Sequence, residues 1–338
     1  SQAVRIFISL RIIKWLKPPM KLSYWEIKSW LTDIDFAVIG SGIVGLSCAI
    51  RLREWHPKAK IVIFERGQMP QGASTKNAGF ACFGSVSEIL DDLDHHEEEE
   101  VVDLIGQRIQ GLHELRVLLG DKEIGFQQRG GYEMFLVNEA TTHATCLEKM
   151  PYINSLISEL VPGETFQLRK NSFGYKGINE TLIFNQYEGQ IDTGKMMQSL
   201  LQQAYKKDVL ILNSASLESF EEIKGRVQLQ FDSFQTSCSK LLIATNGFSS
   251  GLLNEDVSPN RAQVLITEPI PDLAIKGTFH MDRGYYYFRN IDDRILLGGG
   301  RNLDFETEET AVFALNEKIQ NQLEQLLRES ILPNQEIA

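Results

Sequence analysis

Short apolar runs alternate with glycine-rich turns and amphipathic stretches near the start of the chain. Asp35–Ile39 and Ile61–Phe64 are apolar runs of the length and kind found in buried parallel strands. Between them, Leu46–Trp55 places apolar residues at helical spacing, and Pro57 follows as a helix-ending residue. The pattern predicts a strand, a turn, a helix and a second strand in direct succession.

The rest of the chain follows the same two periodicities. Gly72–Gly84 is small and polar, which is typical of a loop. Helices are predicted at Ser87–Leu119, Thr193–Tyr205 and Glu309–Leu327. Strands are predicted at Gly130–Val137, Val209–Leu212, Val227–Phe231 and Lys240–Ala244, with a hairpin of Gly284–Phe288 and Arg294–Leu297.

The turn after the first strand has the spacing of a dinucleotide-binding motif. Gly40 permits a tight turn, Gly42 lets a pyrophosphate approach the backbone, and Gly45 lets the helix pack closely on the sheet. The following helix offers free N–H groups and partial positive charge to the phosphates. Glu65 follows about 20 residues later, where the motif expects an acid for the ribose hydroxyls. The motif alone does not separate NAD from FAD.

Composition narrows the class of protein. A chain of 338 residues suits two domains or one composite domain, and 43% hydrophobic and 23% charged residues are ordinary for a globular protein. The net charge of −11 argues against nucleic acid as the main partner, because phosphate binding needs a basic face. The four cysteines form no CxxC pair, so we expect free thiols in a reducing compartment and a cytoplasmic protein. No apolar run reaches the roughly 20 residues of a membrane-spanning helix.

The N-terminal segment has two interpretations. Val4–Leu16 mixes large apolar residues with Arg5, Arg11 and Lys14, which would suit an interfacial anchor or a degenerate signal. The alternative, which we favour, is an upstream extension with Met20 as the natural start. Because the chain begins with Ser, it is also expected to be a fragment.

Four stretches together resemble the D-amino-acid oxidase superfamily, the group of glycine oxidase and monomeric sarcosine oxidase. The most specific is Gly72-Ala73-Ser74-Thr75-Lys76-Asn77-Ala78-Gly79-Phe80, which in that family follows the acidic strand and lies along the flavin. Gly189–Lys195 resembles the entry into a later helix of the family, and Leu241–Gly247 resembles its turn near the cofactor. Tyr286–Arg289 with Ile295–Gly300 resembles the hairpin of its substrate domain.

The resemblance implies a fold, a cofactor and a set of cofactor-binding residues. The fold is α/β, with a doubly wound Rossmann-like FAD-binding domain and an inserted mixed-sheet substrate domain. After an extension at 1–33, the FAD-binding domain takes 34–90 and 189–262, and the substrate domain takes 91–188 and 263–338. The expected FAD contacts are Gly40, Gly42, Ile43, Val44, Gly45, Glu65, Arg66, Ala73, Ser74, Thr75, Asn77, Ala78, Gly79, Phe80, Leu217, Thr245, Asn246 and Gly247.

The best substrate-side candidates lie on the predicted hairpin. Tyr286 and Arg301 are the expected catalytic residues, the first on the strand and the second after a glycine triplet, where it could hold a carboxylate. Strand alternation places Tyr285 and Tyr287 on the other face from Tyr286, and Arg289 completes this group.

Other reactive side chains have ordinary explanations. His95 and His96 lie beside an acidic run, but consecutive helical residues do not share one ligand centre, so we expect no metal. Cys82 follows the expected flavin loop, and a free cysteine is usually a small buried side chain. His280 could act as a base, although a lone histidine is more often structural.

The function that these features favour is oxidation of an amino acid or related amine by hydride transfer to FAD, with oxygen as the acceptor. Two alternatives stay open: a 2-hydroxy-acid dehydrogenase of the same superfamily, and a flavin-binding module without turnover. The expected partner is a small amine or acid, and the oligomeric state is open. The family's second glycine-rich segment and a carboxylate-binding arginine are not visible before Ala338, so we expect a C-terminal truncation that weakens FAD binding.

Overall fold

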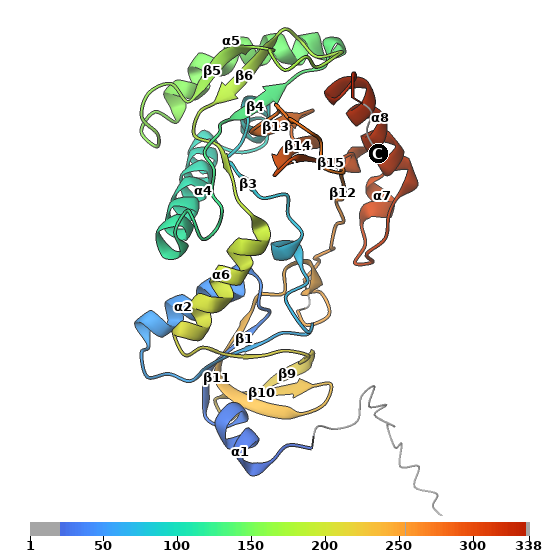
Figure 1. The fold of residues 1–338 in the computed structure, drawn as a ribbon. Helices are drawn as coiled ribbons and strands as arrows, with labels where there is room; N and C mark the ends of the chain where they lie inside the picture. Colours follow the sequence, from blue (N-terminus) through green and yellow to red (C-terminus); the bar gives the residue numbers. More distant parts are fainter. Residues whose placement is uncertain (1–20, 254, 336–338) are drawn as a thin grey trace, which may run out of the picture. The chain divides into compact units, whose positions relative to one another are not determined.

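The computed structural model describes residues 21–253 and 255–335, which divide into two compact units (Figure 1). Of the described residues, unit 1 holds those up to Gln71, Gln202–Thr245 and 251–253, and unit 2 holds Gly72–Leu201, Asn246–Ser250 and those from Glu255 on. The segment Val4–Leu16 lies outside the described residues. Within them, no helix is long and apolar enough to cross a membrane.

Unit 1 is built on a six-stranded sheet in the order β8-β2-β1-β11-β10-β9. β1 pairs in parallel with β2 on one side and β11 on the other, and β8 continues in parallel beyond β2. β10 pairs antiparallel with β11 and with β9, which completes that edge of the sheet (Figure 1). The strands are β1 (Ile34–Ile39), β2 (Ile61–Phe64), β8 (Leu210–Leu212), β9 (Leu217–Ile223), β10 (Arg226–Phe231) and β11 (Gln235–Ile243).

The order of strands in unit 1 follows from burial and chain direction. All four residues of β2 are buried, as expected for a parallel strand covered on both faces. Helix α2 (Ile43–Trp55) buries Leu46, Ala49 and Ile50 and packs on β1 and β2. Because β1 is flanked by β2 and β11, the chain reverses its winding direction between β1 and β11. In open α/β sheets, ligands bind at the carboxyl ends of strands at such a point.

Unit 2 is built on a seven-stranded mixed sheet and a two-stranded sheet. The larger sheet has the order β12-β15-β14-β13-β4-β6-β5, antiparallel except for the β13–β4 pair. Its strands are β4 (Gly131–Met134), β5 (Phe166–Lys170), β6 (Thr181–Asn185), β12 (Gln263–Ile266), β13 (Thr278–Met281), β14 (Tyr286–Ile291) and β15 (Arg294–Gly299). The smaller sheet pairs β3 (Phe80–Ala81) with β7 (Gly189–Gln190).

Helices and short turns connect these strands. The longer helices outside α2 are α3 (Val86–Leu93), α4 (Glu98–Leu119), α5 (Ala140–Leu156), α6 (Thr193–Lys206) and α8 (Glu317–Leu326). The shorter segments are α1 (Tyr24–Glu26), α7 (Phe305–Glu308), η1 (Ile27–Leu31), η2 (Ala73–Thr75), η3 (Val137–Glu139), η4 (Asn246–Phe248), η5 (Arg301–Leu303) and η6 (Leu327–Ile331).

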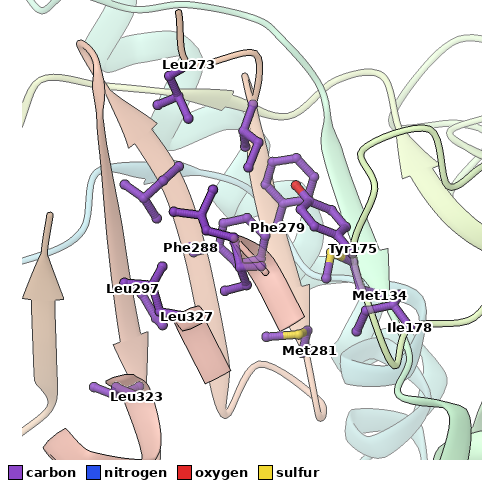
Figure 2. Close-up of a cluster of buried hydrophobic side chains, with 14 of the residues drawn as sticks. Met134, Tyr175, Ile178, Leu273, Phe279, Met281, Phe288, Leu297, Leu323 and Leu327 are labelled. Carbon is purple, nitrogen blue, oxygen red and sulfur yellow. The ribbon is translucent and has the colours of Figure 1, made fainter. Parts of the chain in front are cut away.

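One face of the large sheet in unit 2 packs against the C-terminal helix. Figure 2 shows this cluster, in which Phe279 of β13 and Phe288 of β14 meet Leu323 and Leu327. The two phenylalanine rings stack with centroids 4.5 Å apart and planes 2° from parallel. Because this face is apolar, strand alternation sends the intervening residues of β13 and β14 to the opposite face. We call that opposite face the polar face of the sheet.

The predicted fold class is confirmed, and two predicted helices are wrong in their extent. The single helix expected at Ser87–Leu119 is two helices, because Ser85 and Glu88 form a capping box at α3 and α4 begins anew after Glu97. The acidic residues Glu98–Glu100 thus occupy the first turn of a helix, where the helix dipole favours negative charge.

The helix expected at Glu309–Leu327 begins only at Glu317. Asn316 accepts a hydrogen bond from the amide of Lys318 and caps α8 there. The preceding segment is short helix α7, capped by Asp304, followed by non-helical chain. Side-chain caps therefore set the first residue of α4 and the first residue of α8, and the spacing of apolar residues does not reveal such caps. The hairpin expected around Asn290–Asp293 is confirmed as β14–β15.

The stacked pair in Figure 2 predicts a large packing contribution. Phe288→Ala should lower the free energy of unfolding by about 3–5 kcal/mol, because the deletion leaves a cavity in a rigid aromatic cluster. Urea denaturation measures the change. The exposed Val312→Ala, 64% exposed, is the matched control and should stay within about 0.5 kcal/mol of the parent. Equal effects at the two positions would contradict this account of the core.

Candidate functional site

The turn between β1 and α2 in unit 1 requires glycine at two positions. Gly40 has φ +102°, and a Cβ there would lie 2.7 Å from the carbonyl oxygen of Ala244, which follows β11. A Cβ on Gly45 would overlap the carbonyl oxygen of Gly40. The tight turn and the close helix–strand packing expected from the sequence are therefore both present. Gly42 is the N-cap of α2 and contributes no side chain there.

Glu65 anchors this turn from the end of β2. The carboxylate is 7% exposed, and Oε2 accepts hydrogen bonds from the Ser41 amide at 3.0 Å and the Ser41 hydroxyl at 2.7 Å. Its Oε1 accepts from the Gly67 amide at 2.8 Å. Glu65 thus fastens the middle of the glycine turn to the end of the neighbouring strand. Contact with a ribose, as expected from the sequence, stays a prediction.

Thr245 presents an unpaired polar atom near the same turn. Its backbone nitrogen lies 3.9 Å from where a Gly40 Cβ would be, and its buried hydroxyl has no hydrogen-bond partner. Buried hydroxyls are normally paired, so an orphan beside a phosphate-binding turn is typical of a ligand site.

The other candidates of unit 1 differ in exposure. Val44 is 63% exposed at the start of α2, and Arg66 is exposed after β2. Leu217, by contrast, is 9% exposed and its side chain belongs to the apolar core.

The candidate turn at Asn246 and Gly247 lies in unit 2. Asn246 has φ +48°, and its side-chain oxygen accepts a hydrogen bond from the Gly247 amide at 2.6 Å.

In unit 2, the segment Gly72–Phe80 folds around the side chain of Asn77. Its amide nitrogen donates to the carbonyls of Ala73 and Ser74, and its oxygen accepts from the Gly79 amide at 3.0 Å. The Thr193 hydroxyl at the start of α6 also donates to this oxygen at 3.0 Å. The segment is therefore a pre-shaped loop, with η2 as its first turn.

Arg289 lies on the polar face of the large sheet and reaches the end of this loop. Its guanidinium Nη1 donates to the Gly79 carbonyl at 3.2 Å. Gly79 has φ +72°, and a side chain there would collide with the Ile191 carbonyl and come within 3.2 Å of Arg289 Nη2. The loop and the arginine thus approach as closely as glycine allows.

The charge of Arg289 is buried and incompletely paired. The residue is 4% exposed, and its Nε has no hydrogen-bond acceptor. Burial lowers its pKa to about 10, against the opposing pull of Asp192 and Asp292, so the guanidinium is protonated at neutral pH. Within the described part of the chain, no carboxylate forms an ion pair with it. A buried cation without an anion is costly, which indicates an anionic ligand.

Tyr286 and Tyr287 lie on opposite faces of the large sheet, and Arg301 follows the sheet in η5. Tyr287 contacts Phe80 edge-on at 5.6 Å and therefore lies on the polar face beside Arg289. Tyr286 packs instead against the apolar cluster of the other face. Arg301 in η5 stacks over the Phe305 ring at 5.3 Å, and its buried Nε has no partner. The structure thus groups Tyr287 and Arg289, and it places Tyr286 apart from them.

A second polar group on this face involves residues that the sequence did not single out together. His280 of β13 pairs with Glu188 at 2.9 Å, and Glu188 also accepts from the Thr278 hydroxyl at 2.8 Å. The Cys82 sulfur lies within 4.8 Å of both ligand-type atoms. Glu188 precedes β7 directly, but no local pattern connects it with a histidine so distant in sequence.

Comparison with known proteins decides the family. Residues 35–337 match the family model described as DAO, FAD dependent oxidoreductase. The chain belongs to the DAO family of FAD-dependent oxidoreductases. A search of curated protein sequences finds no match.

Solved structures show the same fold at low sequence identity. Glycine oxidase from Geobacillus kaustophilus has a TM-score of 0.64 at 16% identity, covering 88% of this chain and 77% of that one. L-proline dehydrogenase from P. horikoshii has a TM-score of 0.68 at 14% identity, covering 90% and 79%. L-amino acid deaminase from Proteus vulgaris, with its specific insertion deleted, has a TM-score of 0.63 at 18% identity, covering 91% and 77%.

The residues of each unit fit the cofactor of the DAO family. In unit 1, the helix N-terminus at Gly42, the crowded Gly40 and the orphan hydroxyl of Thr245 suit a phosphate-bearing group. In unit 2, the loop around Asn77 suits the flavin end. The expected cofactor, FAD, and the expected class, an FAD-dependent oxidoreductase, are confirmed by the family. The individual contacts stay predictions.

The phosphate turn gives the first test of these contacts. Gly42→Val should abolish bound FAD while leaving the fold, because a branched side chain at the N-cap blocks backbone approach. Flavin absorbance per protein measures the loss. Gly111→Val in α4, where nothing lies within 4 Å of the added Cβ, is the matched control and should keep its flavin. Unchanged flavin content in Gly42→Val would remove this role.

Glu65 gives a second test. Glu65→Ala should weaken FAD binding by about 1–3 kcal/mol, through lost charge-assisted hydrogen bonds. Titration of the flavin-free protein with FAD and with FMN, which lacks the adenosine ribose, separates two causes. If the affinity for FAD falls and the affinity for FMN does not, Glu65 contacts the ribose. Equal loss for both flavins would show that Glu65 acts only by holding Ser41.

Proposed function

We propose that this DAO-family protein oxidises an amino acid or a related amine bearing a carboxylate, with molecular oxygen as the final acceptor. The observation that carries the proposal is Arg289, a buried guanidinium whose Nε lacks an acceptor. A substrate carboxylate would supply the missing anion, and planar guanidinium and carboxylate groups match in geometry.

The similar structures support the choice of substrate class. Glycine oxidase, L-proline dehydrogenase and L-amino acid deaminase are named for amino acids, each of which carries a carboxylate. Beside Arg289, the ring of Tyr287 provides apolar surface for the rest of a small substrate. The part of the polar face around Arg289 therefore combines one charge-specific contact with an aromatic ring, as small-molecule sites often do.

The chemistry divides between cofactor and protein. FAD, when bound, supplies the hydride acceptor. Oxidation removes a hydride from the α-carbon and a proton from the nitrogen, which turns the amino acid into an imino acid. Oxygen then takes up the two electrons and two protons and becomes hydrogen peroxide. Arg289 orients the carboxylate and so fixes which C–H bond is presented. His280 is unsuited as the base, because its pairing with Glu188 keeps the ring protonated at neutral pH.

Anaerobic flavin reduction tests the proposal directly. The FAD-loaded protein is mixed with amino acids, with the matching amines lacking a carboxylate, and with 2-hydroxy acids, and loss of flavin absorbance is followed. We expect reduction by amino acids, followed by reoxidation and peroxide when oxygen is admitted. Reduction only by 2-hydroxy acids would replace the proposal with a dehydrogenase. No reduction by any class would leave a flavin-binding module.

The two arginines give a matched pair of variants. Arg289→Gln should raise KM for the amino acid substrate by about 10- to 100-fold, corresponding to roughly 1.5–3 kcal/mol for a hydrogen bond to a charged group. Arg301→Gln, whose guanidinium stacks on Phe305, should change KM less than threefold. Flavin content is checked in both. A larger effect at Arg301 would restore the role expected from the sequence.

A further inference from the structure

The buried pair of Glu188 and His280 has a structure built around it. Glu188 is 1% exposed and His280 is 5% exposed. A Cβ on Gly131 of β4 would overlap the Glu188 carboxylate, so that strand leaves room for the acid by having no side chain there. The Thr278 hydroxyl, 0% exposed, donates to the same oxygen that pairs with His280.

The charges of this group are those of an ion pair. Burial opposes protonation of His280, but the charge and the hydrogen bond of Glu188 outweigh it and raise the pKa to about 9. Burial, followed by the charges of Glu188 and Glu88, raises the pKa of the Cys82 thiol well above its usual value. At neutral pH the group therefore holds an imidazolium, a carboxylate and a neutral thiol.

Stability alone does not explain such a pair. Desolvation of two charges offsets much of their attraction, so a buried ion pair is weak evidence for a stabilising role. What the pair does fix is geometry, because Glu188 holds the histidine ring, the Thr278 hydroxyl holds the acid, and Gly131 leaves the space that the acid fills.

The ring that His280 contacts is the one that ends the loop assigned to the flavin. Phe80 lies edge-on to His280 at 5.2 Å and 73°, and edge-on to Tyr287 at 5.6 Å and 79°. Its strand β3 pairs with β7, where Phe80 is opposite Gln190 and Ala81 is opposite Gly189. Glu188 directly precedes β7. The same short segment therefore pairs with the backbone of Phe80 through β7 and holds His280, which contacts the Phe80 ring.

We propose that Glu188 and His280 are positioning residues, a buried ion pair that fixes the ring of Phe80 in the orientation that bound flavin meets. The proposal rests on the FAD-dependent reaction proposed above and on the prediction that Gly72–Phe80 lies along the flavin. It concerns neither substrate contact nor proton transfer.

The first experiment uses the FAD-loaded full chain and the visible circular dichroism of the flavin. Glu188→Gln and His280→Gln should each change this spectrum and weaken FAD binding by about three- to thirtyfold. Glu308→Gln is the matched control. Glu308 is a 0% exposed carboxylate of unit 2 that accepts hydrogen bonds from Arg261 and Gln263 and is not among the charges that act on His280. It should leave the flavin spectrum unchanged.

The second experiment is a pH titration of the unmodified protein. Because the pKa of His280 is raised, its favourable pairing is fully present below about pH 6.5 and is lost as pH rises through about 9. The flavin spectrum should therefore change with a midpoint near pH 9. The titratable or charged groups that face His280 include Glu188, Glu88 of α3, Glu133 of β4 and Tyr287, its cross-strand neighbour on β14. Cys82 after β3 and, near Cys82, Arg108 of α4 complete this set.

The outcomes are separable. In Phe80→Leu and His280→Gln the midpoint near pH 9 should disappear while flavin stays bound. Two results overturn the proposal: a flavin spectrum of the unmodified protein that stays constant from pH 7 to 10, and a midpoint near pH 9 that persists in Phe80→Leu. Both results stand even if the Glu188 variant does not fold. Neither measurement uses a substrate, so failure of amino acid turnover with these results intact would remove the proposed function alone.

Discussion

A buried charge must meet an opposite charge or a set of hydrogen-bond donors, and much of this structure is arranged around that requirement. Glu65 is satisfied by Ser41 and Gly67, and Glu133 by the first amides of α3. Glu308, 0% exposed, accepts hydrogen bonds from Nε and Nη2 of Arg261, which lower the pKa of this carboxyl to about 2. Arg289 departs from this rule, and its incomplete pairing is what gives the polar face of unit 2 its chemical character.

Local sequence was sufficient for the elements whose shape depends on neighbouring residues. The β1–α2–β2 unit is set by apolar runs and by glycines that the backbone needs within a few residues of one another. The hairpin β14–β15 is also local, and alternation along it correctly separates Tyr286 from Tyr287. Family resemblance supplied the cofactor, which the glycine motif by itself left undecided.

What the sequence did not reveal depends on contacts between distant residues. Glu188 and His280 meet only because β13 lies beside β4 and β7 follows Glu188 directly, and neither strand shows this pairing in its own pattern. Arg289 was recognised as a candidate, but its missing acceptor is visible only once its neighbours are placed. Tyr286 and Arg301 stay predictions as catalytic residues, and the structure adds that Tyr286 packs against the apolar cluster and that Arg301 stacks on Phe305.

The absence of a side chain at Gly131 has an evolutionary meaning. A Cβ at position 131 would overlap the carboxylate of Glu188, so an alanine there would displace the acid from its place beside His280. Relatives that carry a side chain at this position are therefore expected to hold the histidine differently or to lack the acid. A comparison of positions 131 and 188 among relatives would then report whether the buried histidine keeps its charged partner during evolution.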